Sequence, residues 1–430
     1  MIRYTLSRKR KKTIMEVFKF GGASVKDALG VKNLKEVILA TGVTQKIIVI
    51  SAMGKTTNAM ESVVNAYFDN PDIVNPSLQI AIDSHLDIIS QLFITSHPIF
   101  KKVTHTFEQL KNFLAYNKSP NYDFVYDQIV SYGELISTTI ISAYLSEQGI
   151  ENTWLDAREL IKTDSNYRDA QVDWEITQQL IKKSVLPGKL YITQGFIASN
   201  TNNDTTTLGR EGSDYTGGII AYCLNAQSLT IWKDVSGVLN GDPRVFENTV
   251  LLKQIPYEEA IELAFYGASV IHPKTLQPLQ RKEIPLFVKP FTDPKASGTK
   301  VSNSKELFPL IPCYIVKKEQ VLVSLSSLDF SFIMEEHISD VFNLLAINKM
   351  KVDLIQNSAI SFSVCIDNKF KRLESLVSQL KGKFKVSITE NVSLYTIRHA
   401  TTKTIDQFQK GKHILLKQVA GHTAQLIVKS

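Results

Sequence analysis

Short apolar runs alternate with segments of helical periodicity from residue 15 to about residue 290. Several of these runs are apolar on both faces, which is typical of strands in a parallel sheet that helices cover on both sides. Between the runs, apolar side chains recur at helical spacing, for example at Phe100, Val103 and Phe107. The alternation predicts an α/β fold, a three-layer αβα sandwich with a mainly parallel sheet. The predicted strands are 16–20, 46–51, 153–156, 190–194, 229–232 and 286–288.

The pattern changes after residue 290. Residues 291–305 are rich in Thr, Pro, Ser, Lys and Gly, as is typical of a linker. The chain then gives a predicted βαββαβ series, which is the order of a complete ferredoxin-like module. Its strands are 321–325, 352–356, 360–366 and 384–388, and its helices are 332–347 and 370–380.

A second, shorter series follows, with strands at 394–397, 414–419 and 424–428 and a helix at 402–410. This series lacks one helix and one strand of the βαββαβ order, and the apolar run 311–316 is the obvious donor of the strand. We therefore expect the first module to be inserted into the second. The predicted domains are 15–295, a first module at 320–388, and a second module made of 306–319 and 389–430.

Length and composition narrow the class of protein. A chain of 430 residues is longer than one ordinary domain of ~150 residues. With 43% hydrophobic and 21% charged residues, disordered and fibrous chains are excluded. No apolar run reaches the ~18–20 residues of a membrane span, so we expect no membrane partner. The three cysteines lie 90 and 52 residues apart, which fits neither a disulfide framework nor a zinc site and indicates a cytoplasmic location.

The net charge of +7 is concentrated at one end of the chain. Residues 1–14 contribute +6 and contain no acid, so the remaining residues carry only +1. The charge therefore gives no basic surface over the fold, and we expect no nucleic-acid partner. We interpret 1–14 as a disordered basic tail, with Met15 as an alternative start. A tail that binds an anionic partner and an organelle transit segment are the other interpretations.

The first predicted strand runs into Gly21 and Gly22, then a small hydroxyl residue and a helix. Glycines let the backbone approach a phosphate, and the N-terminus of a helix favours an anion. Lys19 would lie at the carboxyl end of the strand, beside the phosphates. The alternative is a plain strand-to-helix turn with a surface lysine.

The exit of the second strand contains Gly54-Lys55-Thr56, which resembles the end of a Walker A loop. That motif requires a glycine five residues before Gly54, where the chain has Val49 inside the strand, so we do not expect a P-loop. The hydroxyl groups of Ser51 and Thr57 nevertheless lie where open α/β sheets bind ligands, at the carboxyl end of a strand.

Three further segments carry candidate chemistry. Residues 205–217 combine Gly209 and Gly212 with an arginine and a helix start, which predicts another anion site. Residues 232–244 form a strand end followed by turn residues and charges. Residues 265–273 are interpreted as a helix that breaks at Pro273, and His272 as a structural histidine.

Five segments occur together in this order, namely 19–25, 133–137, 207–216, 234–244 and 267–273. Together they resemble the aspartokinases, the aspartate kinases of the amino-acid kinase superfamily. The two C-terminal modules resemble the regulatory ACT domains of that family, and the resemblance runs from about residue 15 to the C-terminus. Because no room remains for the homoserine dehydrogenase domain of some members, the resemblance is to the monofunctional enzymes.

The resemblance implies transfer of the γ-phosphoryl group of ATP, bound with Mg²⁺, to the β-carboxylate of L-aspartate. This nucleophile has a pKa near ~4 and needs no general base at neutral pH. The difficulty is electrostatic, because two unit charges 4 Å apart repel by about 4 kcal/mol at an effective dielectric of ~20. By resemblance, Lys19 is the catalytic cation and Asp214 holds it in position.

The resemblance also assigns binding residues. Arg210 would clamp the α-carboxylate of the substrate and Glu134 would pair with its α-ammonium, while three hydroxyl groups would contact the carboxylates. The substrate-binding residues are Ser51, Thr57, Glu134, Arg210 and Ser213. The ATP-binding residues are Lys19, Gly21, Gly22, Gly209, Lys233, Asp234, Leu239, Asp242, Arg244 and Ser269. No metal ligand from the protein is expected.

Four positions depart from the family pattern, which usually has threonine, glycine, an aromatic residue and lysine there. In this chain they are Ala23, Glu211, Leu239 and Ser269. Two other functions stay open. One is a related kinase that forms an acyl phosphate on another amino acid such as glutamate, and the other is a non-catalytic amino-acid sensor built on the ACT modules.

Regulation is implied by the same resemblance. We expect a homo-oligomer, a dimer through the ACT modules, and an amino-acid effector near Asp353 and Ser358. The alternative for Asp353 is that it caps a strand end or faces solvent. Residues 335–337, Glu-Glu-His, replace the small glycine-containing loop of lysine-sensitive members, which argues against inhibition by lysine.

Overall fold

The computed structural model describes residues 15–429 apart from 269, 270 and 330. The predicted basic tail, 1–14, and the predicted ATP contact Ser269 lie outside the described residues. The described residues form two compact units. The first contains residues 15–238, 251–261 and 271–307, and the second contains 239–250, 262–268 and 308–429.

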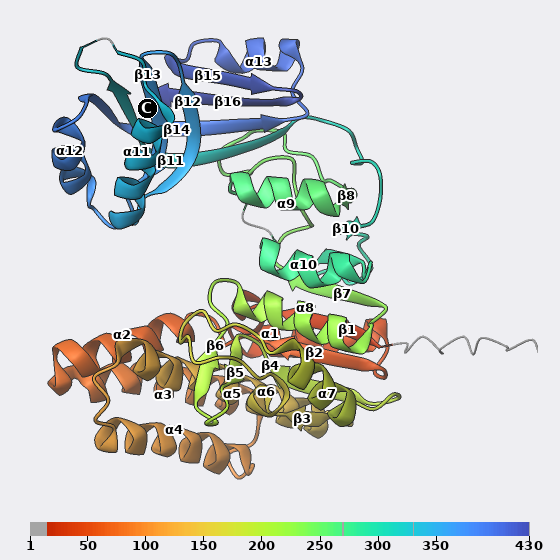
Figure 1. Cartoon of the computed structure of the whole chain (residues 1–430). Helices are drawn as coiled ribbons and strands as arrows, with labels where there is room; N and C mark the ends of the chain where they lie inside the picture. Colours follow the sequence, from red (N-terminus) through yellow and green to blue (C-terminus); the bar gives the residue numbers. More distant parts are fainter. Residues whose placement is uncertain (1–14, 269–270, 330, 430) are drawn as a thin grey trace, which may run out of the picture. The chain divides into compact units, whose positions relative to one another are not determined.

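The first unit is built on a mainly parallel sheet with the strand order β3-β4-β2-β1-β7-β9-β10-β8 (Figure 1). All predicted strands are present in it, which confirms the α/β class and the parallel sheet. The antiparallel pair is β9 with β10. The strands are β1 (Glu16–Phe20), β2 (Lys46–Ile50), β3 (Thr153–Leu155), β4 (Leu190–Gln194), β7 (Ser228–Lys233), β8 (Gln254–Pro256), β9 (Leu286–Pro290) and β10 (Thr299–Ser302).

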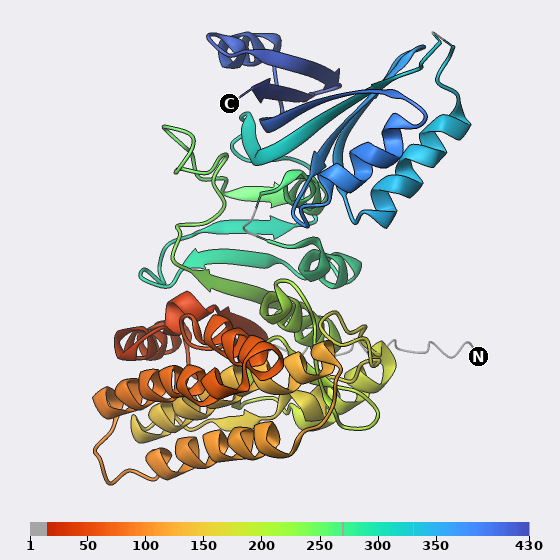
Figure 2. The ribbon, with the colours of Figure 1, turned by 90° about the vertical axis from the view of Figure 1, so that its left-hand side faces the viewer.

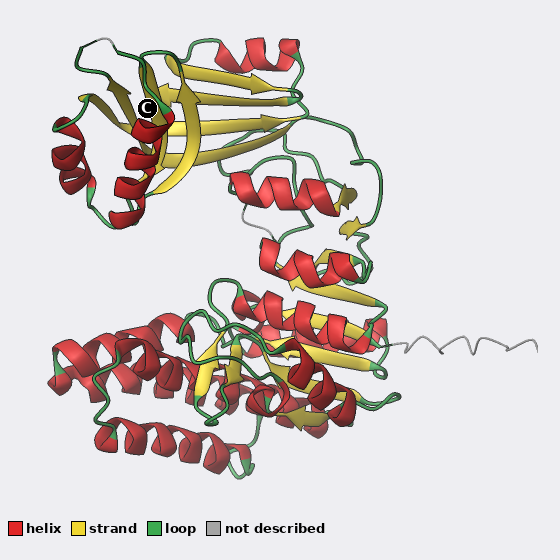
Figure 3. Ribbon diagram, in the orientation of Figure 1, coloured by secondary structure: helices red, strands yellow, loops and turns green. Residues whose placement is uncertain are grey.

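Helices connect these strands and cover them (Figure 3). The helices of the first unit are η1 (Gly22–Val25), α1 (Ala28–Thr41), α2 (Thr56–Asp69), η2 (Pro71–Ile73), α3 (Val74–Leu92), α4 (Ile99–Tyr116), α5 (Tyr122–Glu147), α6 (Ala157–Leu160), α7 (Trp174–Ser184), α8 (Gly212–Leu224) and α10 (Pro273–Arg281). A short hairpin of β5 (Ile197–Ser199) and β6 (Thr205–Thr207) precedes α8. None of the helices in the described part of the chain is long and apolar enough to span a membrane.

The core of the first unit follows from the apolar runs. Every residue of β2 and β4 is buried, as the two-faced apolar pattern predicts for covered parallel strands. Trp232 at the end of β7 packs edge-on against Phe18 and stacks on Phe20, both from β1. These large aromatic groups fix the two central strands next to each other just below their carboxyl ends.

The segment 265–273 differs from the prediction of one helix that breaks at Pro273. Helix α9 (Tyr257–Tyr266) ends at Tyr266, and Pro273 is the first residue of α10. Gly267 has a φ of 117°, a conformation that glycine adopts readily and that terminates the helix. Proline is favoured at the first helical position because it lacks the N–H that would have no partner there.

The second unit is an antiparallel sheet with the strand order β12-β13-β11-β14-β16-β15. Two of its strands, β11 and β14, are 14 residues long and cross much of the sheet (Figure 2). The strands are β11 (Cys313–Ser326), β12 (Lys351–Asn357), β13 (Ser361–Asp367), β14 (Lys385–Arg398), β15 (Ile414–Ala420) and β16 (Thr423–Lys429). The helices are α11 (Glu335–Ile347), α12 (Leu373–Lys381) and α13 (Thr402–Gln409).

The sequence predicts separate strands where the structure has β11 and β14. Residues 313–317 of β11 pair with 394–398 of β14, and residues 322–326 pair with 385–389. The run 311–316 is thus a neighbour of 394–397, as its predicted role as a donor strand requires. Polar residues 317–320 interrupt the apolar pattern, and the register shifts there, so one bulged strand looks like two in the sequence. The domain boundaries themselves stay predictions.

Candidate functional site

The carboxyl ends of the central strands bring the candidate residues together. Strands β4, β2, β1 and β7 run parallel and in register, so their exits lie along one edge of the sheet. In open α/β sheets this edge is where ligands bind. The exits from β1 and β2 carry Gly21-Gly22 and residues 51–54, and the exits from β4 and β7 carry Gly195 and Asp234.

The exits of β1 and β2 pack against each other so closely that a side chain at Gly22 has no room. The Gly54 amide donates to the Gly22 carbonyl at 3.0 Å, and a Cβ on Gly22 would lie 2.7 Å from the Ala52 carbonyl oxygen. Gly22 therefore lets the exit of β1 approach the exit of β2. The Lys19 ammonium lies beside Gly21, 3.4 Å from where a Cβ of that glycine would stand. The result is a compact backbone turn with a cation at its side, which is suited to an anion.

Lys19 is held by the buried carboxylate of Asp214 in the first turn of α8. The Lys19 Nζ lies 2.6 Å from Asp214 Oδ1, and the Lys233 Nζ lies 3.6 Å from Asp214 Oδ2. Burial by itself would raise the pKa of Asp214, but the charges of Lys19 and Lys233 outweigh burial and hold this pKa below its ordinary value. Asp214 is therefore an ionised anchor for two cations and is unsuited to be a proton acceptor.

Glu134 on α5 is a buried carboxylate that faces the same exits. It is 2% exposed, and its Oε1 accepts a hydrogen bond from the Ala52 amide at 3.3 Å. Its Oε2 has no hydrogen-bond partner within the described residues. Burial raises the pKa of Glu134 to about 8, and the Ala52 amide and the charge of Lys19 offset this only in part. Among the described residues, Glu134 forms no ion pair with a lysine or an arginine, although the charge of Lys19 acts on it.

Helix α5 approaches the exit of β2 closely because of Gly133. A Cβ on Gly133 would lie 3.0 Å from the Ala52 Cβ and 3.1 Å from the Thr56 Cγ2. One turn further along the helix, the Ser137 hydroxyl donates to the Ser51 carbonyl at 2.8 Å. The Gly-Glu-Leu-Ile-Ser sequence thus combines close approach, a buried acid and a hydroxyl clamp on one helix.

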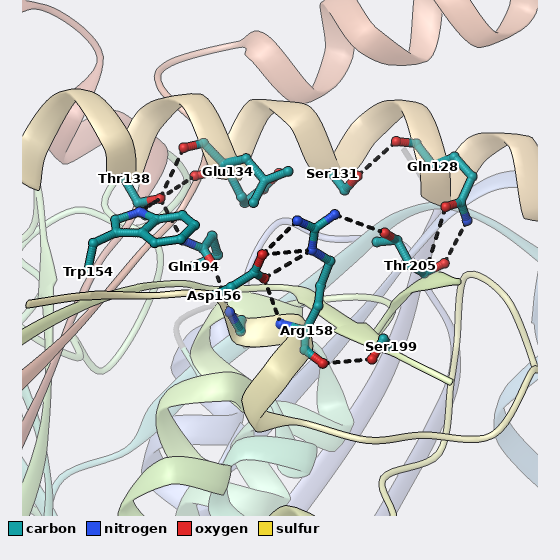
Figure 4. A network of polar contacts seen from close by, with 12 residues as sticks. Gln128, Ser131, Glu134, Thr138, Trp154, Asp156, Arg158, Gln194, Ser199 and Thr205 are labelled. Atoms are coloured by element: carbon teal, nitrogen blue, oxygen red, sulfur yellow. Dashed lines mark hydrogen bonds and ion pairs between the residues drawn. The ribbon is translucent and has the colours of Figure 1, made fainter. Parts of the chain in front are cut away.

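The same face of α5 fixes the exit of β4 (Figure 4). The Gln194 side-chain amide donates to Thr138 Oγ1 at 2.7 Å, and its oxygen accepts from the Ala157 amide at 2.7 Å. The Trp154 indole also donates to Thr138 Oγ1, at 3.0 Å. These bonds connect α5 to β3, β4 and α6. Thr138, which accepts two of them, lies one turn after Glu134 on the helix.

The loop before α8 places Ser213 against the exit of β4. A Cβ on Gly195 would lie 2.5 Å from the Ser213 Cβ, so glycine is required for this approach. Glu211, which precedes the helix, has a φ of 56° and is exposed, as is Arg210. The acid at position 211 therefore points away from the buried part of the site, while Arg210 is free to reach a ligand at its surface.

The remaining predicted site residues are distributed as follows. Ser51 and Thr57 are half-buried at the β2 exit, and Asp234 is exposed after β7. The predicted ATP contacts Leu239, Asp242 and Arg244 belong to the second compact unit, where Arg244 and Asp242 form an ion pair with 2.7 Å between Nη2 and Oδ2.

The predicted effector residues also lie in the second unit. Asp353 is the third residue of β12 and does not face solvent, because its side chain is 5% exposed. Its Oδ1 lies 2.6 Å from the Lys317 ammonium and 3.6 Å from that of Lys351. Ser358 is exposed and contacts Ser361 at 2.7 Å. A lysine of the chain itself therefore already pairs with Asp353.

His272, interpreted from the sequence as a structural histidine, caps α10 by accepting the Lys274 amide at its Nδ1, and burial and the charge of Arg210 lower its pKa. Sequence reasoning missed one group near the site. Asp127 on α5 is fully buried, and burial raises its pKa to about 6, although hydrogen bonds from Arg168 and Thr207 oppose the shift. No motif marks Asp127 in the sequence, because its partners lie about 40 and 80 residues away.

Comparison with known proteins points to one family. Residues 15–290 match the Amino acid kinase family. The chain is similar to lysine-sensitive aspartokinase 3 of Escherichia coli, with 32% identity over 89% of this chain and 86% of that protein. It is also similar to chloroplastic aspartokinase 1 of Arabidopsis thaliana, with 30% identity over 91% of this chain and 74% of that protein.

Two solved structures resemble nearly the whole chain. The E. coli aspartokinase III complex with lysine and aspartate matches with a TM-score of 0.81 at 30% identity, covering 96% of each chain. The complex of the same enzyme with aspartate and ADP matches with a TM-score of 0.80 at 28% identity over the same share of each chain.

Proposed function

Because the chain belongs to the aspartokinases of the amino acid kinase family, we propose that it transfers the γ-phosphoryl group of ATP to the β-carboxylate of L-aspartate. The products are 4-phospho-L-aspartate and ADP, and the reaction is the entry to lysine, threonine and methionine biosynthesis. The observation that carries the proposal is the group of Lys19, Asp214 and Lys233 beside the glycine turn of β1. The similar E. coli enzyme with aspartate and ADP bound supports the choice of substrates.

In this mechanism the protein supplies charge and position. The attacking carboxylate has a pKa near ~4 and is ionised at neutral pH, so no residue has to remove a proton. Lys19 neutralises the phosphoryl group during transfer, and Lys233 adds a second positive charge on the same side. Asp214 keeps both ammonium groups in place before the substrates arrive, so little reorganisation is needed in the transition state.

Glu134 provides the specificity for an amino acid. Its buried carboxylate with one free oxygen is the partner we assign to the α-ammonium of aspartate. Arg210 is assigned to the α-carboxylate, which a guanidinium group binds in a bidentate manner. Ser51, Thr57 and Ser213 are assigned as hydroxyl donors to the substrate carboxylates.

We assign ATP to the glycine turns and the cations around them. Backbone amides of Gly21, Gly22 and Gly209 bind phosphate oxygens together with Lys19 and Lys233. Further ATP contacts are assigned to Asp234, Leu239, Asp242, Arg244 and Ser269. Within the described residues no cluster of three or more His, Cys, Asp or Glu is arranged to hold a metal ion. We assign Mg²⁺ to the phosphates of ATP, whose charge it neutralises.

We also propose a homo-oligomer assembled through the first C-terminal module. Large apolar side chains of this module are exposed, with Leu328 at 66%, Phe332 at 67% and Ile347 at 64%. Exposed apolar groups of this kind are typical of protein–protein interfaces. An amino-acid effector is assigned to Asp353 and Ser358, and it would have to displace Lys317 from Asp353.

The test is ATP-dependent acyl-phosphate formation, trapped as the hydroxamate. L-aspartate, L-glutamate and N-acetylglutamate are compared, with Lys19→Ala as the control. We expect turnover on aspartate alone, and its loss in the variant. Turnover on glutamate instead would favour the related acyl-phosphate-forming kinase. Folded protein that binds an amino acid without turnover would favour the non-catalytic sensor.

A further inference from the structure

Asp127 is a buried charged side chain that the mechanism above does not use. It lies in the second turn of α5 with 0% exposure. Its Oδ2 accepts the amides of Arg168 at 3.0 Å and Thr207 at 2.8 Å, and its Oδ1 accepts the Thr207 hydroxyl at 2.7 Å. One carboxylate thus joins a helix, the end of β6 and the loop around residue 168.

Both segments that Asp127 holds meet at Gly209. Thr207 precedes Gly209 by two residues, and a Cβ on Gly209 would lie 3.1 Å from the Arg168 carbonyl oxygen and 2.6 Å from Asp169 Oδ1. Gly209 has a φ of 76° and Arg168 a φ of 68°, both in the left-handed region. An L-residue adopts this conformation at a cost, so the Arg168 turn needs a partner such as Asp127 to hold it.

The contacts continue beyond Gly209. The Ala170 amide donates to the Thr207 carbonyl at 3.0 Å, which completes the attachment of the loop to β6. The Asp169 carboxylate forms an ion pair with Lys274 in the first turn of α10. Next to Thr207, Gln128 on α5 binds both the amide and the carbonyl group of Thr205, at 3.2 and 2.8 Å (Figure 4). Helix α5 is therefore hydrogen-bonded to both ends of β6, through Gln128 at Thr205 and through Asp127 at Thr207. The bonds of Asp127 are the ones nearest to Arg210 along the chain.

We propose that Asp127 is a positioning residue for the Gly209–Arg210 loop and sets the affinity of the site for the α-carboxylate of the substrate. This inference rests on the proposed function, which assigns that carboxylate to Arg210. Arg210 is exposed, and its side chain would sample many conformations if its backbone were not held in place. Holding Thr207, three residues before it, and the neighbouring Arg168 turn by a buried carboxylate reduces the conformational entropy lost on binding.

The test compares ligands that differ in one group. Succinate lacks the α-ammonium of aspartate, and β-alanine lacks the α-carboxylate. In Asp127→Ala we expect the KM for aspartate and the inhibition constant of succinate to rise at least about tenfold. The inhibition constant of β-alanine should stay within about twofold, because it has no group for Arg210 to hold. The KM for ATP and kcat should change less than the KM for aspartate.

Asp127→Asn is the rescuing variant. Its amide oxygen accepts the two backbone amides and its NH₂ group donates to the Thr207 hydroxyl, so we expect constants within about threefold of the unaltered protein. Thr207→Val removes the hydroxyl bond alone and should show a smaller loss with the same ligand pattern. The matched control is Asp123→Asn, which removes the surface ion pair with Arg168 but leaves its amide in place.

Two results would overturn the inference. One is an equal loss of affinity for aspartate, succinate and β-alanine in Thr207→Val and Asp127→Ala, which indicates general damage to the site. The other is unchanged affinity for aspartate in both variants. Absence of aspartate phosphorylation by the unaltered protein would instead refute the proposed function and this inference with it.

Discussion

Glu134 is a single residue whose ionisation decides whether a cationic substrate group can bind. Its pKa is raised to about 8 mainly by burial, so most molecules carry the neutral acid at pH 7. An ammonium group binds to the ionised form of Glu134. Below pH 8, binding therefore requires Glu134 to lose its proton. The raised pKa disfavours the ionised form of Glu134 in the free protein, and it is consistent with a binding site for a positive charge.

We predict that the KM for aspartate falls as the pH rises toward 8. Below the raised pKa the ionised fraction drops about tenfold per pH unit, so KM at pH 6.5 should exceed KM at pH 8 by roughly tenfold or more. Initial rates at several pH values measure this. In Glu134→Gln the KM should be high at every pH. A wild-type KM that is flat between pH 6.5 and 8 would contradict the assignment of Glu134.

Asp214 leads to a second prediction at the scale of one residue. Asp214→Asn leaves Lys19 and Lys233 without their shared anion, and removing one partner of a buried pair costs about 3–5 kcal/mol of unfolding free energy. Since the folded-state pKa is lowered, this stabilisation is present above pH ~4 and is lost as the pH falls through the folded-state value. Urea unfolding of both proteins at pH 7 and at several values below pH 4 measures the difference. A gap that widens in acid would contradict the ion-pair explanation.

At this scale the sequence predicted the residue types well. It placed Lys19, Glu134 and Asp214 in one site, and the structure brings them to the same sheet edge. The roles assigned to them stay predictions. Asp127 and the pairing of Asp353 with Lys317 were missed, because both depend on contacts between distant segments that no local pattern encodes.

Among the elements, the exit of β1 is the most constrained. We predict that Gly22→Ala lowers kcat/KM by at least about tenfold and destabilises the protein by roughly 1–3 kcal/mol, since its Cβ would overlap the Ala52 carbonyl. Activity assays and thermal unfolding measure both effects. Gly382→Ala is the control, because its Cβ would meet nothing closer than 3.8 Å. Similar behaviour of the two variants would show that the close approach is unimportant.

Element boundaries were predicted where a local signal exists. The glycines and buried runs of β1, β2 and β4 give strand ends to within a residue. The short strands β8 and β10 were not predicted, because three or four residues carry too little periodicity. The end of α9 was misplaced since the apolar residues after Gly267 continue the pattern although the backbone does not.

For the whole molecule, we predict that the protein is not a monomer. Sedimentation should give at least twice the chain mass of 48.3 kDa. Phe332→Ser combined with Ile347→Ser replaces two exposed apolar side chains and should shift the mass toward one chain. Leu186→Ser, an exposed apolar residue of the first unit, is the matched control. A monomeric unaltered protein would refute the proposed assembly.

The continuous strands β11 and β14 have a consequence for synthesis of the chain. Cys313 pairs with Arg398, so the first residues of β11 cannot pair with β14 until the intervening segment has been translated. At ~5–20 residues per second this delay is roughly 4 to 17 seconds. During that time a strand with free edge groups is exposed to neighbouring nascent chains, and Lys317 and Lys318 at its centre provide charge that discourages intermolecular pairing. Ribosome-associated chaperones would therefore meet this segment before any other part of its sheet is complete.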